Sequence, residues 1–431
     1  MDDFVHNPDA TAPVHSSARP RADASRWSPG GSPRRLSILG ATGSIGSNTL
    51  DLVARNPDAF DVVAVTAYSN AGPLSALAKA HRAETAVVAD PASYLELKSL
   101  LAGTGIEAAA GADALVEAAT RPADCVVAAI VGAAGLRPTF AAVAQGRRVA
   151  LANKECLVTG GDVFMAAVAA AGTELLPVDS EHSAAFQAIG TSDLASIERI
   201  TLTASGGPFR TWSSKRLATA TLEEALRHPN WTMGPKITID SATLVNKGLE
   251  LIEAHYLFPV GATRLDVVVH PQSIIHCLVS FQDGSVLAQL ANPDMRTPIA
   301  LSLSFPARMP APTAPLDLVK LGTLTFEAPD HQRFPAINLA RAALARGGSA
   351  PAIFNAANEI AVEAFLARRI CFLDIAATVA TCLDRADAES LVTTPRTLDE
   401  VLEIDRQARI LARNVIGEGL VPVGIRSLAR L

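Results

Sequence analysis

The chain has 431 residues, and at about 150 residues per domain this length predicts roughly three domains, each able to bury its own core. Its 37 Lys and Arg residues against 43 Asp and Glu residues give a net charge of -6, which excludes the basic surface of a general nucleic-acid binder. With 49% hydrophobic and 19% charged residues, a disordered polymer is excluded as well.

The first 34 residues are rich in Pro, Ser, Ala and Arg and have no apolar core of a signal peptide. We expect a disordered tail or a misassigned start, and acids such as Asp2 and Asp23 disfavour a transit peptide. The longest uncharged apolar stretch, Cys125 to Leu136, is too short for a bilayer, so no membrane partner is expected. Five scattered cysteines without a C-x-x-C pair predict no disulfide framework and favour a reducing cytoplasm.

Residues 35–178 alternate short apolar runs with helical ones: LSILG, IGSNTLDLVARN, VVAVTA, LSALAKAH, TAVVA, CVVAAIVG, RVALAN and ELLPV. Buried strands separated by helical segments predict a doubly wound parallel sheet, a Rossmann-like α/β domain.

Residues 179–305 contain the strand-like runs ITLTAS, DVVVH, SIIHCLVSF and SVLAQL between Gly and Pro punctuation, which predicts an α+β domain. Residues 306–330 carry repeated prolines and predict an extended linker. Residues 331–431 show helical spacing of apolar residues throughout, so we expect a C-terminal α-helical bundle.

A glycine turn follows the first predicted strand and opens a helix, with Gly40, Gly43 and Gly46 at its corners. Such a turn lets the backbone approach a pyrophosphate, which the helix N-terminus then binds. An ordinary strand-to-helix turn is the alternative, but the position in a βαβ unit favours a dinucleotide.

The next strand, Val62 to Ala67, ends in Tyr68, Ser69 and Asn70 without an Asp or Glu. An acid there would hold the ribose hydroxyls of NAD and repel a 2′-phosphate, so its absence favours NADP. None of these three residues is an Arg, and the basic partner of the phosphate stays unidentified.

Tyr94 and Lys98 match the Tyr-x-x-x-Lys pair of short-chain dehydrogenases, in which Lys lowers the pKa of Tyr. The pair comes too soon after the glycine turn to reach a nicotinamide, and its surroundings have an ordinary helical surface pattern. We therefore interpret it as a surface feature.

Asp179, Ser180 and Glu181 follow the run ELLPV, where open α/β sheets bind ligands. Two carboxylates two residues apart at a strand end point the same way, and hard oxygen donors suit Mg²⁺ or Mn²⁺. An acidic loop or helix cap is the alternative for this hexapeptide alone.

A third carboxylate favours the metal site: Glu250 lies four residues after Asn246 and so on the same helix face. Glu253 is a rival, but it lies further into the helix, and we expect it to form a surface pair. Asp240, earlier in the same segment, could equally well be a helix-capping residue as a site residue.

Two segments look suited to a small anion. The first, ASGGPFR, offers the hydroxyl of Ser205 and flexible backbone amides. The second, HPNWTMG, combines His228 with the indole of Trp231 in a loop that could close over a substrate. Each alone is unspecific, since Gly-Gly-Pro is usually a turn and a lone His usually structural; with Ser241, Asn246 and Lys247 they would form a phosphate pocket.

Asn153, Lys154 and Glu155 stand at the end of the strand RVALAN. Strand ends in this sheet face the cofactor, so these side chains could orient nicotinamide and substrate. A solvated Lys-Glu pair is the alternative.

These motifs resemble the 1-deoxy-D-xylulose 5-phosphate reductoisomerase family of the methylerythritol phosphate route to isoprenoids. The segments that carry the resemblance, over residues 35 to 420, are GATGSIG, LANKE, VDSEHSA, ASGGPFR, HPNWTMG, ITIDSATLVNKGLE, HPQSIIH, PDMRTPIA and FNAANEIAVEAFL. The resemblance implies an NADPH domain, a catalytic domain and a helical bundle, usually in a homodimer. Many members carry a Gly and a basic residue before the position of Asn70, where this chain has Tyr68 and Ser69.

The resemblance also implies site residues. It places a Mn²⁺ or Mg²⁺ ion, with Co²⁺ as a further choice, on Asp179, Glu181 and Glu250. It implies catalytic roles for Lys154, Glu155, Asp179, Glu181, Glu250 and His228. Substrate contacts would come from Lys154, Ser180, Glu181, Ser205, His228, Ser241, Asn246, Lys247 and Glu250. Cofactor contacts would come from Gly40, Thr42, Gly43, Ser44, Ile45, Gly46, Asn70, Asn153, Glu155 and Gly234.

The implied reaction is the metal-dependent rearrangement of 1-deoxy-D-xylulose 5-phosphate, a small phosphorylated sugar, and its reduction by NADPH to 2-C-methyl-D-erythritol 4-phosphate. One alternative is a metal-independent NADP-linked semialdehyde or hydroxy-acid dehydrogenase. Another is a non-catalytic nucleotide sensor whose acidic cluster is structural.

Overall fold

The computed structural model describes residues 30–229, 231 and 233–419. The predicted doubly wound sheet is confirmed: seven parallel strands lie in the order β4-β3-β2-β1-β5-β6-β7. The strands are β1 (Arg34–Leu39), β2 (Phe60–Ala67), β3 (Thr85–Val88), β4 (Glu107–Ala110), β5 (Cys125–Ala128), β6 (Arg148–Leu151) and β7 (Leu175–Pro177). Because the order reverses between β1 and β5, the loops after these strands diverge and open a crevice at the carboxyl edge.

Helices cover both faces of this sheet, and each face has its own hydrophobic core. Leu36 and Ile38 of β1 point into one core, whereas Leu39 points into the other, as expected for alternating side chains of a strand buried on both faces. The helices are α1 (Ser44–Arg55), α2 (Ala71–Ala80), α3 (Tyr94–Leu100), α4 (Ala112–Thr120), α5 (Leu136–Val143) and α6 (Glu155–Ala171).

A second, mixed sheet follows, with the order β11-β10-β8-β9. Only β8 and β9 are parallel; the other pairs are antiparallel. The segment contains α7 (Ser180–Ile189), β8 (Ile197–Ala204), α8 (Ser214–Leu217), α9 (Leu222–Ala225), α10 (Pro235–Ala242), α11 (Val245–Leu257), β9 (Leu265–Val269), β10 (Ile275–Phe281) and β11 (Val286–Leu290). The four runs predicted to be strand-like are strands, and the structure shows that they form one sheet.

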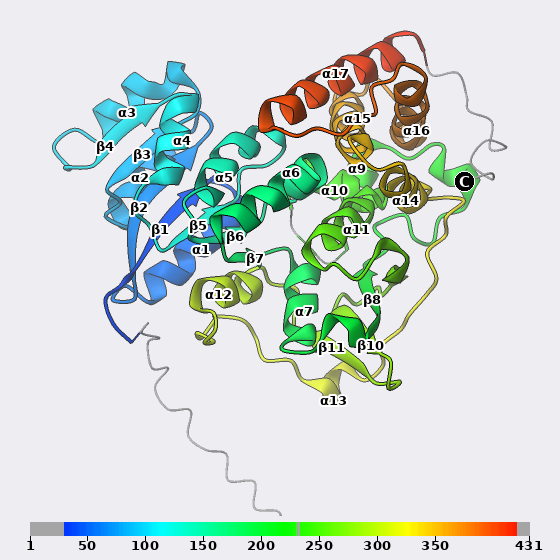
Figure 1. Ribbon diagram of the computed structural model, residues 1–431, viewed down its shortest axis with the longest axis horizontal. Coiled ribbons are helices and arrows are strands. Elements are labelled where there is room, and N and C mark those ends of the chain that lie inside the picture. The colour runs from blue at the N-terminus through cyan, green and yellow to red at the C-terminus, as the bar shows by residue number, and fades with distance from the viewer. Residues whose placement is uncertain (1–29, 230, 232, 420–431) are drawn as a thin grey trace, which may run out of the picture.

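The last helices form the expected C-terminal α-helical region (Figure 1). They are α14 (Ala336–Arg346), α15 (Ala350–Leu366), α16 (Phe372–Ala388) and α17 (Leu398–Gly417). Their core includes Val158 from α6 and Leu249 and Ile252 from α11. The bundle thus shares a core with the two helices that begin beside the cavity described below.

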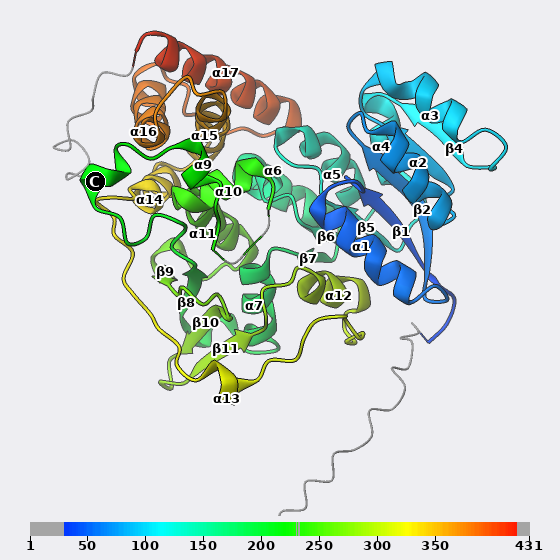
Figure 2. The same cartoon turned by 180° about the vertical axis from the view of Figure 1, so that it is seen from behind.

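One segment packs differently from its position in the chain. Helix α12 (Arg296–Ser304) buries Ile299 and Leu303 in the core of the first sheet with Leu36. This segment was predicted to belong to the central region, residues 179–305, because it directly follows the strands of that region in the chain. Residues 306–330 then return past the second sheet with one short helix, α13 (Leu318–Leu321), and a bridge between Val269 and Glu327 (Figure 2).

In the part of the chain that the structure describes, no helix is long and apolar enough to cross a membrane.

Candidate active site

The glycine turn between β1 and α1 is packed so tightly that two of its glycines admit no side chain. Gly40 has a φ of +87°, and a Cβ there would lie 2.6 Å from the backbone oxygen of Ala129. A Cβ on Gly46 would collide with the backbone of Gly40 and Ala41. The packing brings the N-terminus of α1, after its N-cap Gly43, to the wall of the cavity. Free amides and a helix dipole at this place fit a dinucleotide pyrophosphate.

A cavity of about 540 Å³ opens at the carboxyl edge of the first sheet, between that sheet, the second sheet and α10 and α11. Most of the residues predicted for the site line it. They are Gly43, Ser44, Ile45, Asn153, Lys154, Glu155, Asp179, Ser180, Glu181, Ser205, His228, Gly234, Ser241, Asn246, Lys247 and Glu250.

Four residues predicted for the cofactor do not line this cavity. Gly40 and Gly46 allow the close backbone packing of the turn, and Thr42 lies in the turn itself. Asn70 lies at the N-cap of α2, beyond the end of β2, next to the exposed Tyr68. The end of β2 therefore presents neutral side chains where an adenosine phosphate would lie.

The three predicted metal ligands converge although they are far apart in sequence. Asp179 is the N-cap of α7, Glu181 lies in its first turn, and Glu250 comes from α11. One oxygen from each lies within 4.8 Å of the other two. The two acids were predicted to point the same way because residues two apart in a strand do so. That reason was wrong, because the chain has already entered helix α7 at these residues.

Two lysines lie among these carboxylates. Lys154 Nζ lies 2.6 Å from Asp179 Oδ2 and 3.6 Å from Glu250 Oε1. Lys247 Nζ lies 2.8 Å from Glu181 Oε1 and also contacts Glu250. Three carboxylates against two ammonium groups leave one negative charge without a partner in a buried place.

The surroundings shift the pKa values of Asp179 and Glu250 in opposite directions. Burial would raise the pKa of Asp179, but the Lys154 ammonium holds that pKa well below its usual range. Burial, with the neighbouring Glu181 carboxylate, raises the pKa of Glu250 to about 8. Three hard oxygen donors with excess negative charge fit a divalent cation such as Mg²⁺ or Mn²⁺.

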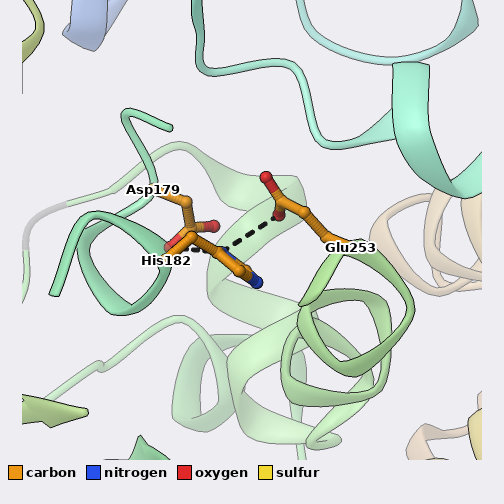
Figure 3. Close-up of side chains that lie close together, drawn as sticks. All are labelled: Asp179, His182 and Glu253. Carbon is orange, nitrogen blue, oxygen red and sulfur yellow. Dashed lines mark ion pairs between the residues drawn. The ribbon is translucent and has the colours of Figure 1, made fainter. Parts of the chain in front are cut away.

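A second cluster adjoins the first and shares Asp179 with it (Figure 3). His182 Nε2 lies 2.9 Å from the backbone oxygen of Glu250 and must donate to it, since a carbonyl only accepts. His182 Nδ1 then faces Glu253 Oε2 at 3.3 Å. Glu253 is 1% exposed, so the prediction of a surface pair was wrong: a spacing of three from Glu250 places both acids on one inward helix face.

Burial governs the charge of this second cluster. It lowers the pKa of His182 and, with the Asp179 carboxylate, raises the pKa of Glu253 well above its usual range. His182 was not predicted from the sequence, although its place one helical turn after Asp179 is a signal that would have indicated it.

At the other end of the cavity, His228 connects the two anion-binding segments. The backbone N–H of Trp231 donates to His228 Nδ1 at 2.9 Å, so Nε2 carries the ring hydrogen and donates to Ser205 Oγ at 3.1 Å. Burial lowers the pKa of His228 to about 4, which keeps the ring neutral at pH 7. Trp231 and Met233 line the cavity; Asn230 and Thr232 of this loop lie outside the described residues.

Helices α10 and α11 complete the wall with Ser241, Asn246 and Lys247. The Lys154 ammonium donates to Asn246 Oδ1 at 2.8 Å, which joins the metal end of the cavity to this wall. The alternative of a solvated Lys-Glu pair is therefore wrong for Lys154, whose side chain is 9% exposed and directed to Asp179.

Asp240 is not a helix cap. It is the sixth residue of α10, is buried, and accepts hydrogen bonds or ion pairs from Lys236 and Asn358. Neither Lys236 nor Asn358 was singled out from the sequence, because the signal is spread over two segments more than 100 positions apart.

The Tyr94 and Lys98 pair lies on α3, where the ammonium lies 5.6 Å from the ring centroid of Tyr94. Neither residue lines the cavity, in agreement with its interpretation as a surface feature.

Enzymes that use a dinucleotide commonly place their substrate where the carboxyl edge of the nucleotide sheet meets a second domain. The cavity lies at such a junction, with a glycine turn on one side and a carboxylate cluster on the other. The molecule therefore falls in the class of nucleotide-dependent oxidoreductases, with a site suited to a divalent cation.

Family models match three parts of the chain: "1-deoxy-D-xylulose 5-phosphate reductoisomerase" over residues 36–161, its "C-terminal domain" over 175–258, and "DXP reductoisomerase C-terminal domain" over 290–411. Curated proteins named 1-deoxy-D-xylulose 5-phosphate reductoisomerase are similar over most of their length. The protein of Zymomonas mobilis is 54% identical over 88% of this chain and 97% of its own, and that of Rhodospirillum centenum 54% over 90% and 95%.

Solved structures agree. The Zymomonas mobilis reductoisomerase in complex with NADPH superposes with a TM-score of 0.84 at 52% identity, over 89% of this chain and 99% of that one. A DOX-P reductoisomerase in complex with NADPH, fosmidomycin and magnesium superposes with a TM-score of 0.86 at 42% identity, over 89% and 98%. The chain belongs to the 1-deoxy-D-xylulose 5-phosphate reductoisomerase family.

Proposed function

We propose that this chain converts 1-deoxy-D-xylulose 5-phosphate to 2-C-methyl-D-erythritol 4-phosphate, with NADPH as reductant and Mg²⁺ or Mn²⁺ as metal ion. The observation that carries the proposal is that the glycine turn and the Asp179, Glu181 and Glu250 cluster open onto one cavity. Membership of the family, and relatives solved with NADPH and magnesium, support it.

The metal ion would be held by Asp179, Glu181 and Glu250. When bound, a divalent cation supplies Lewis acidity to the carbonyl and adjacent hydroxyl oxygens of the substrate during the skeletal rearrangement. Lys154 donates to Asn246 and pairs with Asp179, so it holds one ligand in place and presents a positive charge to the same substrate oxygens.

The cofactor would lie along the first sheet, with its pyrophosphate at the N-terminus of α1. Bound NADPH supplies the hydride that reduces the aldehyde produced by the rearrangement. The Asn153 side chain accepts from the Cys156 N–H at 2.9 Å and donates to the Gly132 carbonyl at 3.0 Å. Asn153 therefore fixes the shape of the wall beside the nicotinamide, while Glu155 and Gly234 face the cavity.

The substrate phosphate would lie between Ser205, His228, Ser241 and Lys247. Hydroxyl donors and a neutral imidazole hydrogen-bond to a phosphate without a strongly basic surface. Since the hydrogen bond from Trp231 to His228 connects the loop to this end of the cavity, phosphate binding would close the loop and exclude water. Anchoring at the unreactive end aligns the reacting atoms with hydride donor and metal.

Turnover of purified protein tests the proposal directly. Oxidation of NADPH, followed by nicotinamide absorbance, is expected only when both 1-deoxy-D-xylulose 5-phosphate and Mg²⁺ or Mn²⁺ are present. Full activity with another aldehyde or hydroxy acid in EDTA would instead support a metal-independent dehydrogenase and refute the proposal.

We also propose a homodimer, with the outer edge of β11, with which no strand among the described residues pairs, in the interface. Val286 and Leu287 on this edge strand are about half exposed, and Leu318 and Val319 on α13 are more exposed still. Figures 1 and 2 place α13 beside β11. Exposed apolar residues beside an unpaired strand edge favour a protein partner. Light scattering should give a dimer for the wild type and a monomer for Leu287→Lys; dimers of both would refute this interface.

We also propose a division of the chain into functional regions and a cellular location. We assign residues 35–178 to the cofactor, 179–305 to metal and substrate, 306–330 to a linker and 331–431 to the helical region, with α12 attached to the cofactor sheet by its packing. The five free cysteines support a cytoplasmic location.

A further inference from the structure

Glu155 belongs to an ion cluster on the cofactor side of the cavity whose other members, Lys236 and Asp240, have no role in the proposed reaction. Lys236 lies in the first turn of α10, and its ammonium lies 2.8 Å from Asp240 Oδ2 and 3.6 Å from Glu155 Oε1. The two acids are almost completely buried, and the lysine side chain is 25% exposed and lines the cavity. One ammonium group therefore serves two buried carboxylates.

A residue of the C-terminal helical region also forms a hydrogen bond with this cluster. Asn358 of α15 is fully buried and donates from Nδ2 to Asp240 Oδ1 at 2.8 Å. Each oxygen of the Asp240 carboxylate thus has a different partner, one from α15 and one from α10. This fixes the plane of the carboxylate and, through it, the position of the ammonium.

Charge makes Lys236 essential to this arrangement. Burial alone would lower the pKa of Lys236, but Asp240 and Glu155 raise it above its usual range, so the side chain stays charged. Without that ammonium, two carboxylates would lie in a buried place with no cation between them, and each would move toward water or toward a neighbouring donor.

Glu155 is the group that this arrangement would orient. It is the first residue of α6, separated from the end of β6 by three residues, and it lies in the cavity wall with Gly43 and Ser44. Gly234, the N-cap of α10, lies two residues before Lys236 and ends the loop that carries Trp231. A clamp at Lys236 therefore fixes both the Glu155 carboxylate and the end of that loop.

We propose that Lys236 is a positioning residue for the cofactor: its ammonium, held through Asp240 by Asn358 of the helical region, orients Glu155 and the backbone at Gly234 for NADPH. The proposal rests on the proposed function, because it takes Glu155 and Gly234, which face the cavity, as the cofactor contacts that the family resemblance implies. If so, the C-terminal helical region contributes to the active site through Asn358, although Asn358 is 118 positions from Asp240 in the sequence.

The first test is NADPH binding to the metal-free enzyme, measured by the fluorescence of the bound nicotinamide. Lys236→Met should weaken binding by about tenfold or more, the amount expected for losing a hydrogen-bonded charge. The Mg²⁺ affinity should stay within about twofold, because Asp179, Glu181 and Glu250 are not part of this cluster. Lys236→Arg keeps the charge and should restore most of the NADPH affinity.

The second test uses two matched asparagines on α15. Asn358 and Asn355 are both fully buried, but Asn355 donates to Glu359 Oε1 at 3.1 Å and not to Asp240. Asn358→Leu should weaken NADPH binding severalfold. Asn355→Leu should have a clearly smaller effect, because its partner Glu359 acts on Lys236 only through its charge, which the substitution leaves in place. Neither substitution alters a charge. Comparing the NADPH affinities of the two asparagine variants therefore tests the proposal even if Lys236→Met does not fold.

A third measurement asks whether the two residues act through one path. In the double variant Lys236→Met with Asn358→Leu, NADPH binding should be no weaker than in Lys236→Met alone. Additive losses, equal effects of the two asparagine variants, or unchanged binding in Lys236→Met would each overturn the inference. If the wild type itself failed to bind NADPH, the proposed function would fail instead.

Discussion

Replacing Glu250 by Gln should abolish the metal response of this protein and yet make the metal-free form more stable. The substitution removes one of three converging carboxylates and keeps the shape of the side chain. Glu250 is 1% exposed, and its carboxylate is the acid of the cluster whose ionised form is least favoured.

The magnitude follows from the pKa. Burial, with Glu181 nearby, raises the pKa of Glu250 from 4.5 to about 8. A folded-state pKa above the unfolded one means that the folded protein binds the extra proton, so its stability falls as pH rises from 4.5 to 8, by about 1.4 kcal/mol per unit at most. At pH 7 the loss amounts to about 3 kcal/mol, which Glu250→Gln should recover.

Thermal unfolding in EDTA and in Mg²⁺, at pH 5 and pH 7, measures both effects. In EDTA the variant should melt several degrees above the wild type at pH 7 and close to it at pH 5. Added Mg²⁺ should raise the melting temperature of the wild type, since a ligand stabilises the state that binds it, but not that of the variant. A variant that melts lower in EDTA at pH 7, or gains equally from Mg²⁺, would refute the reasoning.

Glu253→Gln is the matched control, one helical turn further along α11. A Gln amide can donate to His182 Nδ1, so the contact at 3.3 Å is kept while the buried acid is removed. The stabilisation by Mg²⁺ should therefore persist. If Glu253→Gln lost the Mg²⁺ response and Glu250→Gln kept it, the cation site would be the Asp179, His182 and Glu253 cluster.

Three other substitutions probe the cofactor side. Gly46→Ala should reduce NADPH affinity more than tenfold in a fluorescence titration and leave the Mg²⁺ response intact, because its Cβ would collide with the glycine turn. Ser69→Arg should tighten NADPH but not NADH by about tenfold, since it adds a charged donor at the neutral end of β2; equal changes for the two cofactors would contradict this. Tyr94→Phe should leave steady-state turnover unchanged, because Tyr94 does not line the cavity; a large loss would restore the Tyr-x-x-x-Lys interpretation.

Most of the first sheet could be predicted because its strands are rich in Val, Ile and Leu. Strand β4 was missed: its residues, Glu107–Ala110, read EAAA, which has neither β-branched residues nor alternation. The chain forms a strand there because β3 offers a free edge for pairing. The placement of α12 was likewise hidden, since only tertiary packing shows that Ile299 and Leu303 join the first core.

In the site, the sequence identified residues that lie within one motif and missed those that depend on a second segment. Asp179 and Glu181 share a hexapeptide, and Glu250 belongs to a dense polar segment, so local composition indicated all three. Glu253 was misjudged because burial depends on what packs against a helix face. Asp240 was misjudged for the same reason: its partner Asn358 is 118 positions away.

The charges of the whole cavity wall bear on how an anionic substrate enters it. Five carboxylates and three ammonium groups line the cavity. Because the pKa of Glu250 is about 8, that acid is mostly protonated at pH 7 in the metal-free form, and the wall carries about one excess negative charge. A divalent cation that displaces the Glu250 proton would bring the sum to zero. Before the cation binds, the wall repels a phosphorylated substrate; afterwards that repulsion is removed and the hydroxyl donors decide the fit. A phosphonate analogue should therefore bind at least about tenfold more weakly in EDTA than in Mg²⁺. The reciprocal effect, tighter Mg²⁺ binding in the presence of the analogue, is required by linkage, and calorimetry with both titration orders would expose any failure of this coupling.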